Sequence, residues 1–108
     1  MAYLQRMVDG LLTELLESSG AVLIEGPKWC GKTTTATQQA ASILRLQNPD
    51  TREAYIATAK TKPSLLLKGE TPRLIDEWQI IPQLWDAVRV MVDDRNKMGQ
   101  FILTGSNS

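Results

Sequence analysis

The chain opens with apolar residues at helical spacing. Between Leu4 and Leu16 they recur every three or four positions, at Leu4, Met7, Val8, Leu11, Leu12, Leu15 and Leu16. This rhythm is typical of an amphipathic helix with one buried stripe, and Ser19 and Gly20 follow as a stop signal. The pattern therefore predicts a helix packed on a core. The acidic residues Glu14 and Glu17 on its polar face disfavour a role at a membrane surface.

Four later segments have the pattern of strands. "AVLIE" (21–25) is a continuous apolar run, as expected for a strand buried on both faces of a parallel sheet. "EAYIAT" (53–58) predicts a short second strand, "RLID" (73–76) a third and "FILTG" (101–105) a fourth.

Helices are predicted between these strands. They cover 32–47, which is rich in small residues, and 81–94, with Pro82 in the first turn. The segment 60–72 is ambiguous and is interpreted as mostly loop with a short helix. Alternation of strands and helices predicts an α/β fold with a mostly parallel sheet of about four strands.

The amino-acid composition excludes several kinds of functional site. At 108 residues the chain is large enough for one core, and its 12 basic and 12 acidic residues cancel, which neither indicates nor excludes nucleic acid. It contains no histidine and one cysteine, so histidine-based acid–base catalysis, the usual zinc sites and an internal disulfide are excluded. No apolar run approaches the about 20 residues needed to cross a membrane, and the chain is expected to be cytoplasmic, with no membrane partner.

The motif "GPKWCGKT" (26–33) lies between the first predicted strand and the first predicted internal helix. It fits G-x-x-x-x-G-K-[ST], the Walker A phosphate loop, in which glycines let backbone N–H groups face a phosphate. At these positions Lys32 would reach the β- and γ-phosphates and the Thr33 hydroxyl would bind Mg²⁺. The N-terminus of the following helix also favours an anion. The motif predicts nucleotide binding.

Two acids follow the third predicted strand in "LIDE" (74–77), a Walker B-like pattern. Asp76 is the candidate for holding Mg²⁺ through water. Glu77 is the candidate for orienting the water that attacks the γ-phosphorus. In "FILTGS" (101–106), Thr104 is the first choice for a residue that senses the γ-phosphate or fixes this water. Ser106 and Asn107 are alternatives, and a hydroxyl-rich turn without such a role is the competing interpretation.

Taken together, these segments resemble the prokaryotic AAA-type ATPases whose longer members end in a poorly characterised C-terminal domain. The resemblance rests on "YLQRMVDGLL", "GAVLIEGPKWCGKTT", "PRLIDEWQIIPQLWDAVR" and "GQFILTGS", and covers the whole chain. It implies a P-loop three-layer α/β sandwich. It also implies a nucleotide-binding segment made of Gly26, Pro27, Lys28, Trp29, Cys30, Gly31, Lys32, Thr33 and Thr34, with Thr33 and Asp76 on magnesium and with Glu77, Lys32 and Thr104 as catalytic residues.

The family resemblance also implies parts that the pattern does not supply. An AAA-type core has five parallel strands in the order 5-1-4-3-2 and a helical lid, whereas four strands are predicted here. We therefore expect residues 1–108 to be the N-terminal part of such a domain, with a leading helix over 1–20 and the P-loop core over 21–108. The arginine finger, second sensor and lid would lie elsewhere. The strand 21–25 would then be an edge, which predicts self-association.

The leading functional hypothesis is binding of ATP with Mg²⁺, with hydrolysis in the full-length protein and weak or no turnover in this chain. ATP is preferred over GTP because of the resemblance and because no guanine-reading N-K-x-D motif is present. The alternatives are a nucleotide-dependent switch that controls a partner, and a kinase for a small molecule. Multiple-turnover phosphate release would separate hydrolysis from a switch.

Overall fold

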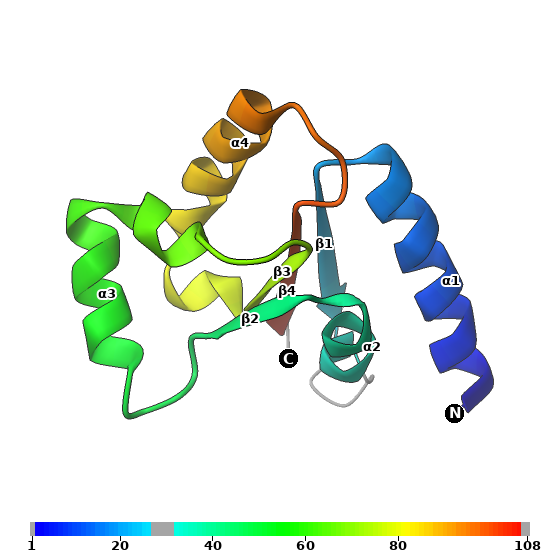
Figure 1. Ribbon diagram of the computed structural model, residues 1–108. Helices are drawn as coiled ribbons and strands as arrows, with labels where there is room; N and C mark the ends of the chain where they lie inside the picture. Colours follow the sequence, from blue (N-terminus) through cyan, green and yellow to red (C-terminus); the bar gives the residue numbers. More distant parts are fainter. Residues whose placement is uncertain (1, 27–31, 107–108) are drawn as a thin grey trace.

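Four parallel strands form one sheet with helices on both faces (Figure 1). The computed structural model describes residues 2–26 and 32–106. In chain order the elements are α1 (Ala2–Ser18), β1 (Ala21–Gly26), α2 (Lys32–Gln39), β2 (Ser42–Arg45), α3 (Arg52–Thr61), a 3₁₀ helix (Pro63–Leu67), β3 (Arg73–Asp76), a second 3₁₀ helix (Trp78–Ile80), α4 (Leu84–Arg95) and β4 (Phe101–Ser106).

The strand order is β1-β4-β3-β2, and every pair is parallel. β4, the last strand in sequence, lies between β1 and β3, so that Ala21 is opposite Phe101 and Arg73 is also opposite Phe101. The order of the four strands is the one expected from the AAA-type resemblance. Within the described residues, β1 is an edge strand.

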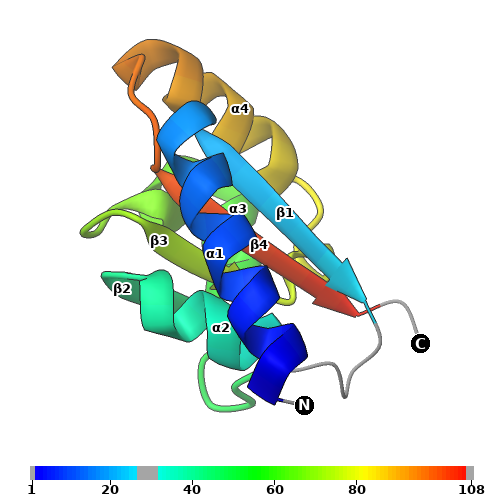
Figure 2. The ribbon, with the colours of Figure 1, turned by 90° about the vertical axis from the view of Figure 1, so that its right-hand side faces the viewer.

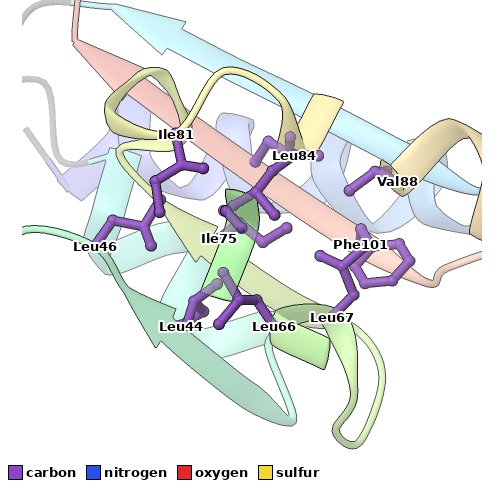
Figure 3. Close-up of a cluster of buried hydrophobic side chains, with 11 residues drawn as sticks. Leu44, Leu46, Leu66, Leu67, Ile75, Ile81, Leu84, Val88 and Phe101 are labelled. Carbon is purple, nitrogen blue, oxygen red and sulfur yellow. The ribbon is translucent and has the colours of Figure 1, made fainter. Parts of the chain in front are cut away.

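Two apolar clusters join the layers. On one face, α1 and α2 cover Val22, Leu74 and Ile102 (Figure 2). On the other face, α3, α4 and the first 3₁₀ helix pack on Ile75 and Phe101 of the sheet (Figure 3). Neighbouring residues such as Leu74 and Ile75 point to opposite faces, so the strands must be apolar throughout, as in parallel sheets covered on both sides. The predicted three-layer α/β fold is confirmed.

Two predicted elements are wrong. The helix predicted over 32–47 ends at Gln39, and Ser42–Arg45 forms β2. In β2, Ile43 packs with the cluster of α1 and α2, whereas Leu44 is buried with the cluster of α3 and α4. This alternation over two faces is the period of a strand, and four residues are too few for the sequence pattern to reveal it.

The second strand predicted over 53–58 is instead the helix α3. Ala59 is buried, and Tyr55 and Ile56 pack against the same cluster, which is a helical spacing with one apolar face. Glu53 in the first turn and Lys60 in the last turn also suit the helix dipole. The β-branched and aromatic residues of this segment have a high propensity for strands. Packing against the sheet nevertheless stabilises a helix here.

The remaining predictions are closer to the structure. The ambiguous segment 60–72 contains the 3₁₀ helix Pro63–Leu67 and loop. The helix predicted over 81–94 begins at Leu84, and Pro82 lies in the turn before it.

Arg73 at the start of β3 links this strand to the first 3₁₀ helix and to β2. Its Nε donates to Leu66 O at 3.0 Å, and its Nη1 donates to Ser42 Oγ at 3.1 Å. Burial lowers the pKa of the Arg73 guanidinium, and the nearby Tyr55 partly offsets that effect.

Candidate nucleotide site at the carboxyl edge of the sheet

The predicted site residues come from three strands that end at the same edge of the sheet. Gly26 at the end of β1 is opposite Ser106 of β4, and Thr104 of β4 is opposite Asp76 of β3. In parallel sheets, ligands bind outside the carboxyl ends of the strands. The pairing therefore brings Gly26, Asp76 and Thr104 to one place, although they are far apart in sequence.

Part of the predicted phosphate loop lies outside the described residues, namely Pro27, Lys28, Trp29, Cys30 and Gly31. The same holds for Asn107. On the two sides of that gap, β1 ends at the buried Gly26 and α2 begins at Lys32. A strand thus precedes the predicted phosphate loop and a helix follows it, which is the setting that a phosphate loop requires. The roles of Lys32, Thr33 and Thr34 stay predictions.

Thr104 connects the two acids. It is fully buried, its hydroxyl donates to Asp76 Oδ1 at 2.8 Å, and its Oγ1 accepts from the backbone N–H of Glu77 at 3.2 Å. One side chain on β4 thus fixes the carboxylate of one acid and the backbone of the next. Contact between Thr104 and a phosphate or water stays a prediction.

Asp76 ends β3 and is almost completely buried. Besides Thr104, it faces Arg45 of β2, whose Nη1 lies 3.9 Å from Asp76 Oδ2. The Arg45 side chain is half exposed, so this ion pair is weak. It nevertheless places a cation at the same edge of the sheet. Arg45 is not predicted from the sequence as a site residue, because it lies in the segment 32–47, for which the pattern predicts a helix.

Glu77 has a left-handed backbone conformation, with φ 61° and ψ 57°, and is buried. Such a conformation is uncommon outside glycine and costs energy, and it occurs often at functional sites. The carboxylate accepts bonds from the Ser106 hydroxyl, from Ser106 N at 3.0 Å and from Gln79 Nε2 at 2.7 Å. These donors hold the Glu77 side chain against the end of β4.

From the sequence, Ser106 is predicted only as an alternative to Thr104, and Gln79 is not predicted as a site residue. Ser106 and Gln79 are the partners of Glu77 in the structure. The available signal was their position near the carboxyl ends of adjacent strands, since Ser106 is the last residue of β4 and Gln79 lies three residues after the end of β3. Their contact depends on the left-handed turn at Glu77, which the sequence pattern does not reveal.

Gly105 allows the elements around Glu77 to approach closely. A Cβ atom at this position would lie 3.1 Å from Trp78 Nε1 and 3.1 Å from Gln79 Oε1. Glycine in the interior of a strand often marks such an approach. The Trp78 ring also stacks at a tilt on Trp85, with ring centroids 4.9 Å apart. Gly105 therefore lets the second 3₁₀ helix, which carries Gln79, lie on the end of β4.

The carboxylate of Asp76 is compatible with Mg²⁺ bound together with a nucleotide. Within residues 2–26 and 32–106, no group of three His, Cys, Asp or Glu residues could hold a metal ion. Mg²⁺ is commonly bound by one or two carboxylates together with phosphate oxygens and water. Asp76 can contribute such a carboxylate, so the donor set fits Mg²⁺ bound with a nucleotide.

None of the described helices is long and apolar enough to cross a membrane.

Comparison with known proteins agrees with this architecture. A family model described as "AAA domain" matches residues 18–108. The chain belongs to this AAA domain family. Its resemblance to AAA-type P-loop proteins is thereby confirmed, and in general terms the domain is of the nucleotide-binding, ATPase-like type.

Two curated relatives of this AAA domain come from mycobacteria. They are uncharacterized proteins of Mycobacterium bovis and Mycobacterium tuberculosis, each 34% identical over 98 residues. The match covers 90% of this chain but 22% of each relative, so the chain spans about a fifth of their length. No solved structure matches the chain significantly.

Proposed function

We propose that this AAA domain binds ATP together with Mg²⁺ at the carboxyl edge of its sheet, and that the full-length protein hydrolyses ATP. The observation that carries the proposal is the strand register, which brings the end of β1, Thr104 and the acids Asp76 and Glu77 to one edge. Residues 1–108 would then be the N-terminal part of the ATPase domain, with the leading helix over 1–20.

Each residue has a role in this proposal. The backbone amides of residues 26–34 and the N-terminus of α2 bind the phosphates, with Lys32 on the β- and γ-phosphates. The Thr33 hydroxyl and Asp76, the latter through water, hold Mg²⁺, which would neutralise phosphate charge. Thr104 supports this by orienting the Asp76 carboxylate, to which it donates at 2.8 Å.

Glu77 is proposed to orient the attacking water. A carboxylate can do this only if its own position is well defined, because a small displacement of the attacking group is costly for the rate. Ser106 and Gln79 hold the Glu77 carboxylate in place through three hydrogen bonds. We assign Ser106 and Gln79 as positioning residues for Glu77, and Thr104 as the residue that links Glu77 to Asp76.

The test of nucleotide binding is a titration of the chain with ATP and with GTP in the presence of Mg²⁺, followed by tryptophan emission. Trp29 lies in the predicted loop, and Trp78 follows Glu77 directly. Replacing Lys32 by Ala removes the charge that would bind two phosphates, and we expect at least about a tenfold loss of ATP affinity.

The matched control is Lys60→Ala, which removes an exposed lysine in the last turn of α3. It should bind ATP as the wild type does. Equal affinity in the wild type and in Lys32→Ala would refute the assignment of the phosphate loop. Equal affinity for ATP and GTP would leave the phosphate site in place but refute the preference for adenine.

A further inference from the structure

A basic residue, Arg45, lies at the same edge of the sheet as the candidate nucleotide site. It is the last residue of β2 and is opposite Asp76, the last residue of β3, in the parallel register. The next residue is also joined to β3, because Leu46 N donates to Asp76 O at 3.4 Å. Strand pairing therefore fixes the backbone of Arg45 beside the acid that is the candidate for Mg²⁺.

The two carboxylate oxygens of Asp76 have different surroundings. Oδ1 accepts from the Thr104 hydroxyl at 2.8 Å on the side of β4, whereas Oδ2 lies 3.9 Å from Arg45 Nη1 on the side of β2. The Asp76 side chain is 10% exposed and that of Arg45 is 53% exposed. A nearly buried carboxylate is thus accompanied by a cation whose side chain extends into solvent.

The contact of Arg45 with Asp76 is one of charge. A separation of 3.9 Å is too long for a hydrogen bond, so the pair leaves the N–H groups of the guanidinium unused. Within residues 2–26 and 32–106, this pair is also the one polar contact of the Arg45 side chain. A guanidinium group with unused donors is well suited to bind phosphate oxygens. Arg45 therefore places a cation suited to phosphate beside Asp76.

We propose that Arg45 is a further phosphate-attracting residue of the candidate nucleotide site, and that it shares the Asp76 carboxylate with Mg²⁺. This inference rests on the proposed function. In the absence of Mg²⁺, Arg45 attracts the phosphates of ATP. In its presence, Arg45 is repelled by a second cation that uses the same carboxylate, so the net contribution of Arg45 to ATP affinity is smaller. Arg45 thereby sets how strongly ATP binding depends on Mg²⁺.

The test is the affinity for ATP, followed by tryptophan emission at low ionic strength, once with Mg²⁺ and once with excess EDTA. Arg45→Gln removes the charge and keeps a polar side chain. We expect ATP affinity to fall about fivefold in EDTA and less than about twofold with Mg²⁺. Mg²⁺ should therefore increase ATP affinity more in Arg45→Gln than in the wild type. The association of Mg²⁺ with ATP in solution is the same for both proteins and cancels in this comparison.

Two matched variants accompany the measurement. Arg45→Lys keeps the charge and should retain most of the wild-type dependence on Mg²⁺, because lysine also binds phosphate as a point charge. Arg89→Gln changes the net charge of the chain as Arg45→Gln does. Arg89 is an exposed residue of α4 that pairs with Asp86 at 3.6 Å and lines a hollow with Ala21, at the opposite end of β1 from the site. Arg89→Gln should bind ATP as the wild type does under both conditions.

The outcomes separate this inference from the proposed function. If the wild type binds ATP but Arg45→Gln has the same ratio of affinities with and without Mg²⁺, Arg45 has no part in the site, while ATP binding stands. An equal loss in Arg89→Gln would show a general effect of surface charge and would also overturn the inference. If the wild type binds no ATP under either condition, the proposed function fails, and the role of Arg45 fails with it.

Discussion

At the scale of single residues, the hydroxyl of Thr104 is the group on which the arrangement of both acids depends. It donates to the carboxylate of Asp76 and accepts from the backbone of Glu77, in a position without solvent contact. Hydrogen bonds to charged groups are stronger than neutral ones, and a buried group left without its partner is costly.

Replacing Thr104 by Val keeps the shape of the side chain but removes both hydrogen bonds. We expect the free energy of unfolding to fall by about 1–3 kcal/mol, because Asp76 and Glu77 N–H lose a buried partner. Denaturation by urea measures this change. Thr104→Ser keeps the hydroxyl, so its free energy of unfolding should fall less than that of Thr104→Val. An equal fall in both variants would contradict the importance of the two hydrogen bonds.

Glu77→Gln tests the proposed role in hydrolysis. The amide keeps the size of the side chain but cannot act as a base, so ATP binding should persist while phosphate release under multiple-turnover conditions falls to background. The measurement belongs on the longer protein, with ATP affinity measured in parallel. Wild-type turnover in Glu77→Gln would remove Glu77 from the mechanism. Absence of turnover in the unmodified longer protein would favour a nucleotide-dependent switch.

At the scale of elements, the C-terminal end of α4 depends on a residue that tolerates a left-handed backbone conformation. The helix α4 ends at Arg95 and is capped by Asn96, which has φ 51° and ψ 45° and donates its N–H to Val92 O at 2.8 Å. Asparagine tolerates this left-handed conformation better than other non-glycine residues. The cap allows the chain to turn directly into the loop before β4.

Asn96→Val should destabilise the chain by about 1 kcal/mol, since a β-branched residue is strained at this φ. Asn96→Gly is the matched control, and it should be neutral or slightly stabilising because glycine adopts the conformation without strain. The midpoints of thermal or urea unfolding compare the two variants. Equal stability of Asn96→Val and Asn96→Gly would contradict the assignment of this cap.

At the scale of the whole molecule, the strand order determines both the site and the exposed edge. Inserting β4 between β1 and β3 places Thr104 beside Asp76 and, at the same time, leaves the outer side of β1 unpaired within the described residues. The candidate nucleotide site therefore lies at the carboxyl ends of the strands.

The sequence by itself determined the strands β1, β3 and β4, the helices α1 and α4, and the α/β class. These segments are apolar for several residues or periodic over several turns, so their local pattern is strong. The sequence also indicated the candidate phosphate loop and the candidate site residues Asp76, Glu77 and Thr104. The spacing of the glycines and the position of the acids after a buried strand can both be recognised along the sequence.

Only the tertiary structure decided the rest. β2 has four residues and α3 carries strand-forming side chains, so packing on the two faces of the sheet overrode local preference there. The bonds from Ser106 and Gln79 to Glu77, and the approach of Arg45 to Asp76, join residues of different strands and turns. Such contacts depend on strand order and on a left-handed turn, and neither leaves a periodic signal in the chain.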